Sequence, residues 1–360
     1  MRMSLENRWR IAIGIFGVLF MFAGPQVLEL FTIINLTTGI ALAVLALSLG
    51  LVWGYGGILC FGQVGFFGLG AYAYTIAAIN FGDTTGAVFV AILVGGAAAA
   101  VLGYFMIYGR VSDVYLAVIT LTFTLILYSL LRRTSGPEYK IGNALLGGFN
   151  GINSPLLNVP GSPSSVLFPE DVFYVAMFVL IVSYFGCLWL IRSHFGRVVV
   201  AIRENELRAE LLGYDIRLYK LLVFTIGGGL AGLAGVLFAN GIGRVTPDMF
   251  NLYNAALTII WVIVGGRGTL IGPIIGAFGM FYLTFFLGTQ TVINNNLVLG
   301  VILIVFVLAV PNGLVPELAK LWRSVLGRRA LSRRERNMRR RSSRRASKDD
   351  ATSSEAPHET

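Results

Sequence analysis

Charged side chains that can bind another molecule are concentrated between residues 192 and 220, in a segment flanked by two long apolar runs. The basic members are Arg192, Arg197, Arg203, Arg208, Arg217 and Lys220. The glutamates Glu204, Glu206 and Glu210 are interleaved with them. Glu204 and Arg208 have the i,i+4 spacing that supports a helix, and Leu207 and Leu211 fall on one face of it. A short amphipathic helix of mixed charge suits docking to a soluble protein better than lying on anionic lipid.

Side chains that catalyse reactions are sparse in the rest of the chain. There are two histidines, His194 and His358, and two cysteines, Cys60 and Cys187, which lie in apolar stretches. The motifs His-Glu-x-x-His, Gly-x-Ser-x-Gly and Gly-x-x-x-x-Gly-Lys-Ser/Thr are missing from the sequence. The sequence therefore predicts a non-catalytic chain with no metal site and no cofactor. Any ATP that it uses must be hydrolysed by another polypeptide.

The elements that hold these residues are predicted to cross a membrane. Hydrophobic residues make up 56% of the 360 residues and charged residues 13%, whereas soluble domains average about 25% charged residues. Apolar runs indicate helices at about 11–27, 34–53, 62–79, 86–107, 114–131, 171–191, 221–240, 253–265, 270–288 and 297–310. We expect an all-α integral membrane protein of about ten transmembrane helices. Because residues 54–61 and 253–265 can be broken or re-entrant, the expected range is eight to ten.

Glycine is unevenly distributed among the predicted spans. Two dense clusters, Gly54, Gly56, Gly57 and Gly265, Gly266, Gly268, are sites where the backbone can unwind. Unwound backbone at membrane depth is tolerated only where it lines a cavity or is buried in protein. We expect a pathway lined by Gly56, Gly57, Gln63, Trp261, Gly265 and Gly266. Thr120, Thr122, Thr124 and Asn240 are further candidates, although a packing or hydrogen-bonding role is commoner for any one of these polar or aromatic side chains.

Other glycines have the small-x-x-x-small spacing that lets helices approach closely in lipid. The predicted packing residues are Gly228, Gly232, Gly268, Gly272 and Gly276, with Gly50 and Gly54 spaced in the same way. No Asp, Glu, Lys, Arg or His lies centrally in a predicted span. Ion-coupled carriers usually need such titratable groups, so the sequence disfavours secondary transport.

Four stretches resemble one known family. They are the runs 195–224 and 62–72, the run 261–270, and Gly-Leu-Ala-Gly-Leu-Ala-Gly at 229–235. They are similar to the high-affinity branched-chain amino acid permeases (LivM-type) and to their urea and short-amide relatives. The resemblance covers about residues 44–316. It implies the permease subunit of an ABC importer for branched-chain (hydrophobic) amino acids, with urea or a short-chain amide as the alternative cargo.

The resemblance also implies partners. These are a paralogous permease that completes a heterodimer, two ABC ATPase subunits and a substrate-binding protein. Residues 207–213 are similar to the Glu-Ala-Ala-x-x-x-Gly loop of importer permeases, which inserts into the ATPase; Ala209 and Gly213 match its small positions. We therefore expect ATPase coupling through Glu206, Arg208, Ala209 and Gly213. Small residues there are expected to let the helix fit a groove of the ATPase.

Loop charges predict the orientation of the chain in a bacterial cytoplasmic (inner) membrane. Arg2, Arg8 and Arg10 place the N-terminus inside, and the basic loop 192–220 and the C-terminus lie on the same side. Residues 132–170 form a long external loop whose Pro and Gly content argues against a folded domain. In the family this loop carries an element similar to Gly-Gly-Phe-Asn-Gly-Ile at 147–152, which suggests contact with the binding protein.

The C-terminal end differs from the body in composition. Residues 320–348 carry 13 of the 28 Lys and Arg residues. We expect a permease domain at 1–315, an interfacial amphipathic helix at 316–326, and a disordered basic cytoplasmic tail at 327–360. The tail is expected to be dispensable for transport and to attract anionic lipid. Because it lacks interleaved aromatic residues, nucleic-acid binding is not expected.

Overall fold

The computed structural model describes residues 17, 19–26, 28–288, 300 and 313–318. The chain divides into two compact units, Met1–Leu314 and Val315–Thr360. The helical body belongs to the first unit, and the described residues of the second, 315–318, are helical. The predicted span at 297–310 lies outside the described residues except for Gly300, and the predicted tail at 327–360 lies wholly outside them.

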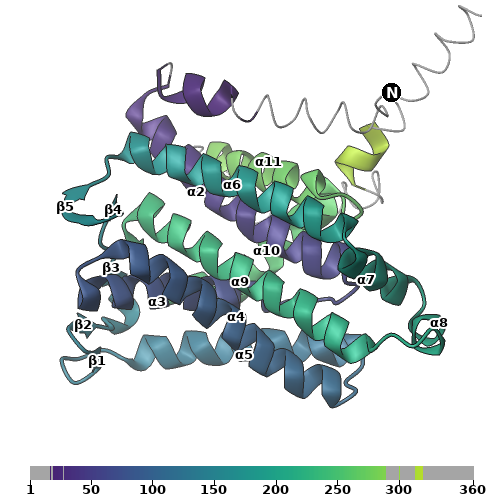
Figure 1. Cartoon of the computed structure of the whole chain (residues 1–360). Helices are drawn as coiled ribbons and strands as arrows, with labels where there is room; N and C mark the ends of the chain where they lie inside the picture. Colours follow the sequence, from purple (N-terminus) through teal and green to yellow (C-terminus); the bar gives the residue numbers. More distant parts are fainter. Residues whose placement is uncertain (1–16, 18, 27, 289–299, 301–312, 319–360) are drawn as a thin grey trace, which may run out of the picture. The chain divides into compact units, whose positions relative to one another are not determined.

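Six helices in the described part of the chain are long and apolar enough to cross a membrane (Figure 1). They are α2 (Leu30–Leu49) with its continuation η1 (Gly50–Tyr55), α3 (Gln63–Phe81), α4 (Thr84–Tyr108), α5 (Asp113–Arg133), α6 (Pro169–Arg192) and α9 (Ile216–Ile242). Two shorter apolar helices, α10 (Leu252–Gly265) and α11 (Ile271–Gly288), follow. The prediction of an all-α membrane protein with broken helices is confirmed.

The predicted break near residue 54 is a change of helix type. The α-helix α2 becomes the π-helix η1, and residues 56–62 then form an irregular segment before α3 begins. Glycines allow this geometry: at Gly57 the backbone φ is +74°, a conformation that glycine adopts without strain. A π-helix is rare in proteins and frequently lies at a functional site.

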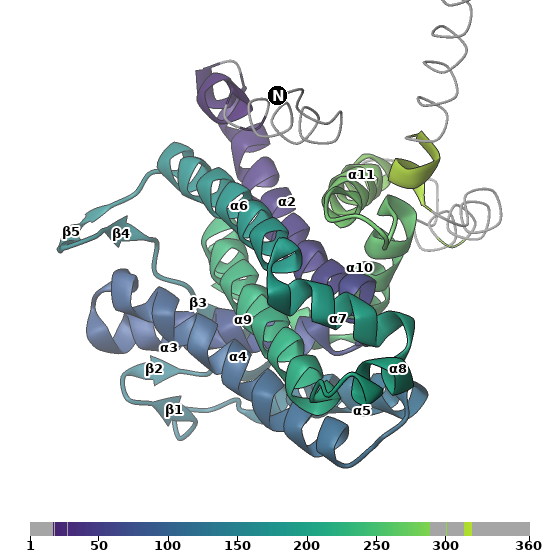
Figure 2. The ribbon, with the colours of Figure 1, turned by 45° about the vertical axis from the view of Figure 1, so that its right-hand side comes forward.

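Small residues position α9 at the centre of the bundle, where it packs against α2, α3 and α4 (Figures 1 and 2). A Cβ atom added at Gly232 would lie 2.6 Å from the carbonyl oxygen of Ala91 on α4. One added at Gly228 would overlap the Cβ atom of Ala99. The expected close approach of helix backbones therefore occurs at both glycines.

The glycines predicted for packing near the C-terminal end of the body behave in two ways. Gly272 and Gly276 lie where α11 crosses α10; a Cβ atom at Gly276 would overlap the carbonyl oxygen of Trp261. Gly268 lies in the turn between the two helices, and no described atom lies within 4 Å of a Cβ atom built there. Among the described residues, therefore, no close helix contact is seen at Gly268.

The loop between α5 and α6 is more ordered than its composition suggests. It contains the strand pairs β1 (Lys140–Ile141) with β2 (Ala144–Leu145), and β4 (Asn158–Val159) with β5 (Ser162–Val166). It also holds η2 (Gly148–Asn150) and β3 (Ile152–Asn153), which pairs with β6 (Arg244–Val245) beyond α9. The side-chain amide of Asn158 also donates a hydrogen bond of 3.0 Å to the carboxylate of Asp83. We call this end of the bundle the strand end.

Asp83 illustrates how the strand end is fastened to the helices. Its carboxylate caps α4 by accepting from the amide of Thr85 at 3.0 Å and also accepts from Asn158. These hydrogen bonds hold the pKa of Asp83 below its ordinary value, and the bond from the amide of Thr85 has the largest effect.

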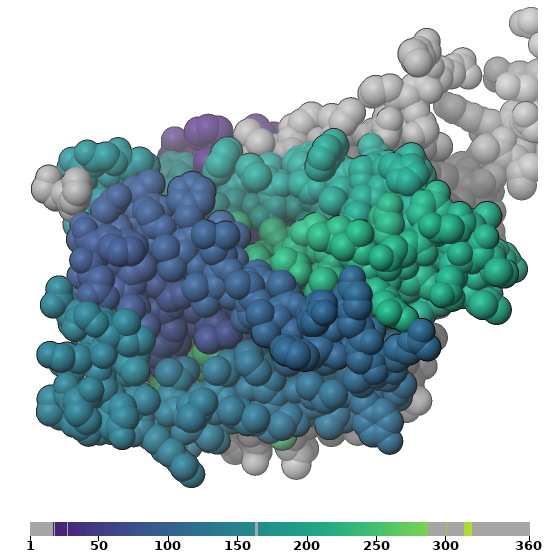
Figure 3. Space-filling view, turned by 60° about the horizontal axis from the view of Figure 1, so that its bottom comes forward, coloured from purple at the N-terminus to yellow at the C-terminus, as the bar shows by residue number. Residues whose placement is uncertain are grey.

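The outward faces of α4 and α5, whose atoms are blue in Figure 3, carry large apolar side chains. Their exposed large side chains are Phe89, Leu93, Val101, Phe105, Val114, Tyr115, Val118, Ile126 and Leu130. In water such a surface would be a liability, but lipid solvates it.

Candidate functional site

The charged loop 192–220 folds as two short helices, α7 (His194–Glu204) and α8 (Glu206–Leu211). The side chain of Ser193 caps α7, and that of Asn205 caps α8 by accepting from the amide of Arg208 at 2.8 Å. The break at Asn205 separates Glu204 from Arg208, so the expected helix containing both is wrong. Glu204 pairs with Arg203 instead.

The faces of α8 are set by burial. Ala209 is 2% exposed and packs against Val198 and Ile202 of α7, inside this chain. Leu207, Leu211 and Leu212 are 67%, 80% and 71% exposed. We call these three leucines the α8 patch. The structure thus places the small residue inward and the apolar surface outward, whereas the sequence expectation assigned contact with the ATPase to Ala209.

Gly213 has a conformational role in ending α8. Its φ is +88°, and its amide donates to the carbonyl of Glu210 at 2.9 Å. No described atom lies within 4 Å of a Cβ atom built there. Within this chain, the requirement for glycine at 213 therefore comes from backbone geometry rather than from close packing.

A polar groove of about 720 Å³ lies beside α8, between the α4–α5 turn and the start of α9. Its charged lining residues are Arg110, Asp113, Glu206, Glu210, Asp215, Arg217 and Lys220. Glu206 is fixed by Lys220, whose Nζ lies 2.5 Å from its Oε1. Arg208 lies on the exposed surface of α8. The sequence did not predict that the α4–α5 turn lines this groove, because Arg110 by itself indicates only which side of the membrane the turn is on.

The two glycine clusters lie against each other. A Cβ atom at Gly54 in η1 would overlap the carbonyl oxygen of Arg267, in the turn between α10 and α11. The Arg267 guanidinium carbon lies 5.5 Å from the centroid of the Trp53 ring. On another side, Arg203 of α7 donates from Nη1 to the carbonyl of Gly54. The clusters therefore meet next to the C-terminal end of α7.

Several polar candidates for the pathway form hydrogen bonds inside the bundle, either between segments or within one helix. The buried amide of Gln63 donates to Ser48 Oγ at 2.9 Å and to the carbonyl of Gly227 at 3.0 Å, linking α3 to α2 and α9. Thr120 accepts from the amide of Phe61 at 3.2 Å. The side chain of Thr122 donates to Val118 and that of Thr124 to Thr120, both within α5.

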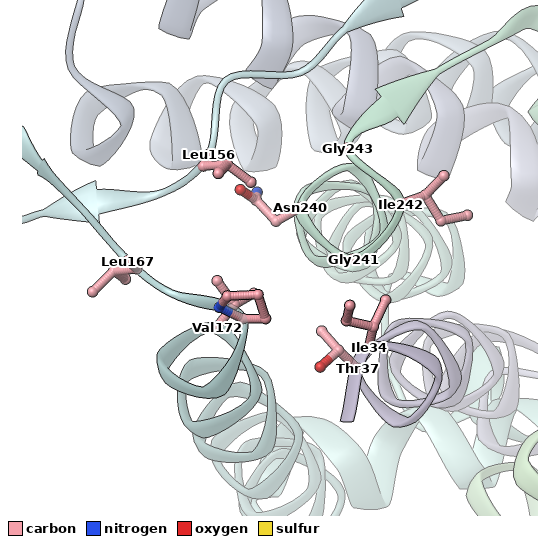
Figure 4. Close-up of a pocket in the computed structure, with 10 residues that line it drawn as sticks. Ile34, Thr37, Leu156, Leu167, Val172, Asn240, Gly241, Ile242 and Gly243 are labelled. Carbon is pink, nitrogen blue, oxygen red and sulfur yellow. The ribbon is translucent and has the colours of Figure 1, made fainter. Parts of the chain in front are cut away.

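Asn240 lines a small cavity of about 190 Å³ at the strand end (Figure 4). Thr37 of α2, Val172 of α6 and Leu167 of the loop before α6 line the same cavity. The Asn240 side chain accepts from the amide of Leu157 at 2.9 Å. It therefore ties the loop between α5 and α6 to α9.

A second cavity, which we call the hairpin cavity, lies between the α10–α11 hairpin and helices α2, α3 and α9. Its volume is about 230 Å³. The lining residues are Leu42, Leu45, Val64, Phe67, Phe238, Met249, Tyr253, Asn254, Leu257, Thr258, Trp261, Phe281 and Thr284. None of them is charged. Trp261 is the predicted pathway residue that lines it, and Gly265 ends α10 one turn further on.

The model of the branched-chain amino acid transport system / permease component family matches residues 31–310. The chain belongs to this family. The branched-chain amino acid permease LivM of Escherichia coli K12 is 30% identical over 292 residues, covering 76% of this chain and 67% of the relative. The probable branched-chain amino acid permease LivM of Methanocaldococcus jannaschii is 26% identical, covering 48% and 54%.

The ribose import permease RbsC of Escherichia coli K12 is 29% identical over 221 residues, covering 58% of this chain and 62% of the relative. Relatives named for amino acids and for a sugar therefore share this sequence pattern, so the family alone does not select the cargo. No solved structure matches the chain significantly. The sequence-based assignment to this permease family is confirmed.

Proposed function

We propose that this chain is the permease subunit of an ABC importer that carries branched-chain amino acids across a bacterial cytoplasmic membrane. The observation that carries the cargo assignment is the lining of the hairpin cavity, which is mostly aliphatic and aromatic. A leucine-like side chain gains free energy on entering such a cavity. Ribose, urea and a short amide have no apolar side chain of this size to bury there, so the lining favours a leucine-like cargo over them.

The proposed energy source is a pair of separate ATPase subunits that dock on the α8 patch. Exposed leucines beside a charged groove supply the apolar centre and polar rim typical of protein interfaces. Glu206 and Arg208 belong to that rim. Ala209 and Gly213 act indirectly, by packing α8 onto α7 and by ending α8 with a tight turn. This end of the bundle is then cytoplasmic, as are both termini.

The remaining partners follow from the same proposal. A paralogous permease completes a heterodimer, and a substrate-binding protein meets the strand end, where the loop between α5 and α6 is fastened to α9 through Asn240. The permease domain covers 1–315. The segment 316–326 lies at the membrane interface, and the basic tail 327–360 adds attraction to anionic lipid, without a nucleic-acid partner.

The cargo is tested by competition in membrane vesicles that contain the assembled importer. Uptake of labelled leucine is measured with an excess of isoleucine, valine, urea, acetamide or ribose. We expect isoleucine and valine to reduce uptake about tenfold or more, and the polar compounds to have little effect, because an apolar pocket discriminates by buried methylene groups. Inhibition by urea or ribose as strong as that by isoleucine would show that the cargo is wrongly assigned.

Two variants of this chain test whether the permease itself, and not only its binding protein, contributes to the leucine uptake measured in this assay. Leu257→Ser places a hydroxyl in the hairpin cavity and should lower leucine uptake. Leu130→Ser, on the exposed face of α5, should leave uptake near that of the unmodified chain. Equal uptake by the two variants would remove the hairpin cavity from the pathway.

A further inference from the structure

The C-terminal end of the broken helix α2–η1 is held by a side chain from another element. The carbonyl of Leu51 accepts from the amide of Gly56 at 3.1 Å. The carbonyl of Val52 accepts from the amide of Ile58, and that of Trp53 from the amide of Gly57, both at 3.2 Å. The next carbonyl, that of Gly54, accepts from the guanidinium of Arg203. A cation at a helix C-terminus is favoured by the helix dipole and by the unsatisfied carbonyls there.

The contact between Arg203 and η1 is close as well as polar. A Cβ atom at Gly57 would lie 2.8 Å from Cγ of Arg203, and the φ of +74° at Gly57 turns the backbone there. The aliphatic part of the Arg203 side chain thus lies against Gly57, and its guanidinium donates to the Gly54 carbonyl of η1. The guanidinium charge is also paired with the carboxylate of Glu204.

The position of Arg203 in the chain connects this contact to the α8 patch. Arg203 lies in the last turn of α7, and Asn205, two residues later, caps α8. On its other side η1 contacts the tip of the α10–α11 hairpin, through Gly54 against Arg267 and Trp53 beneath the Arg267 guanidinium. Arg203 therefore links the residues next to α8 to η1, and η1 in turn contacts the hairpin that borders the hairpin cavity.

We propose that Arg203 is a positioning residue that joins helices α7 and α8 to the C-terminal end of the broken helix α2–η1. Its side chain, the carbonyl of Gly54 and the backbone of Gly57 form a latch that holds residues 54–62 closed until α8 moves. The transport role of the latch rests on the proposed function, whereas the closed state of residues 54–62 is a property of this chain alone.

Cys60 reports directly on that closed state. It lies in the segment held by the latch, is 0% exposed, and in a Cys187→Ser background is the sole cysteine of the chain. Its reaction with a small membrane-permeant maleimide follows the fraction of molecules in which the segment opens. Since a hydrogen bond from a charged donor shifts an equilibrium about tenfold or more, Arg203→Met should accelerate labelling of the full-length chain about tenfold.

Two further variants make this test specific. Arg203→Lys keeps a cationic donor and should restore slow labelling in part. Arg197→Met removes another arginine of α7, whose Nη1 donates to the carbonyl of Arg192 at 2.8 Å, and should leave the rate unchanged. Equal labelling of the Arg203→Met, Arg197→Met and parent chains would overturn the latch. Should Arg203→Met fail to accumulate, Arg203→Gln, which removes the charge but keeps a polar side chain, takes its place, and labelling of that variant at the parent rate overturns the latch equally.

The assembled importer gives a readout that a purely structural role would not change. We expect Arg203→Met to retain the ATPase subunits and basal ATP hydrolysis while losing most leucine uptake. Loss of ATPase binding with unaltered Cys60 labelling would make Arg203 a docking residue and contradict the latch. If the parent importer carries no leucine but Cys60 labelling follows Arg203, the proposed function fails and the closed latch stands.

Discussion

Replacing Gly232 by leucine is expected to remove most folded protein from the membrane. Gly232 lies where three helices meet: a Cβ atom there would be 2.6 Å from the carbonyl oxygen of Ala91 on α4, and Gly70 of α3 packs against the Gly232 Cα atom. The nearest obstacle to a side chain at Gly232 is the backbone of Ala91, so rotation of a side chain cannot make room. Overpacking a core costs about 1–3 kcal/mol and more where backbone must move. Purified yield and Tm in detergent measure the loss.

Gly186→Leu is the matched control for this substitution. Gly186 is also a helical glycine, in α6, but no described atom lies within 4 Å of a Cβ atom built there. Leucine should be tolerated at this exposed position and slightly favour the helix. A Gly232→Leu protein with the yield and Tm of Gly186→Leu would show that α9 does not pack as described.

The double substitution Leu207→Ser, Leu211→Ser is expected to abolish binding of the ATPase subunits without unfolding the chain. Both side chains are mostly exposed, so the chain itself loses little when they are shortened. In a docked complex, burial of each leucine contributes about 1.5–3 kcal/mol, so the pair accounts for roughly a hundredfold or more in affinity. Co-purification of the ATPase from detergent extracts measures the change.

Leu145→Ser serves as the control, because Leu145 is also exposed but lies at the strand end. It should retain the ATPase. Normal recovery of ATPase with the double variant would move the docking surface away from the α8 patch, and the cytoplasmic assignment of this end would lose its main support.

Helix positions and glycine packing were predictable because they depend on local patterns. Apolar runs placed the described long helices within a few residues, and the i,i+4 spacing of Gly228 and Gly232 predicted a close helix crossing. The outward leucines of α8 also follow from helical periodicity. These features need only one segment at a time, or the tendency of small residues to meet.

The features that were missed depend on contacts between distant segments. No local pattern distinguishes Ala209 facing α7 from Ala209 facing a partner, since both need a small side chain. Arg203 looked like one more loop charge because its acceptor, the Gly54 carbonyl, is 149 residues away. The division of residues 194–211 into two helices at Asn205 was predictable, because asparagine directly before Glu206 is a strong N-cap signal.

The central claim is that ATP hydrolysed by a partner drives leucine through this chain. The most direct measurement is uptake of labelled leucine into proteoliposomes that contain the assembled importer and the binding protein, with ATP supplied on the α8 side. We predict uptake against a concentration gradient that requires ATP and persists when ionophores collapse the proton and sodium gradients. Uptake driven by either ion gradient in the absence of ATP, and abolished by the ionophores, would contradict the account.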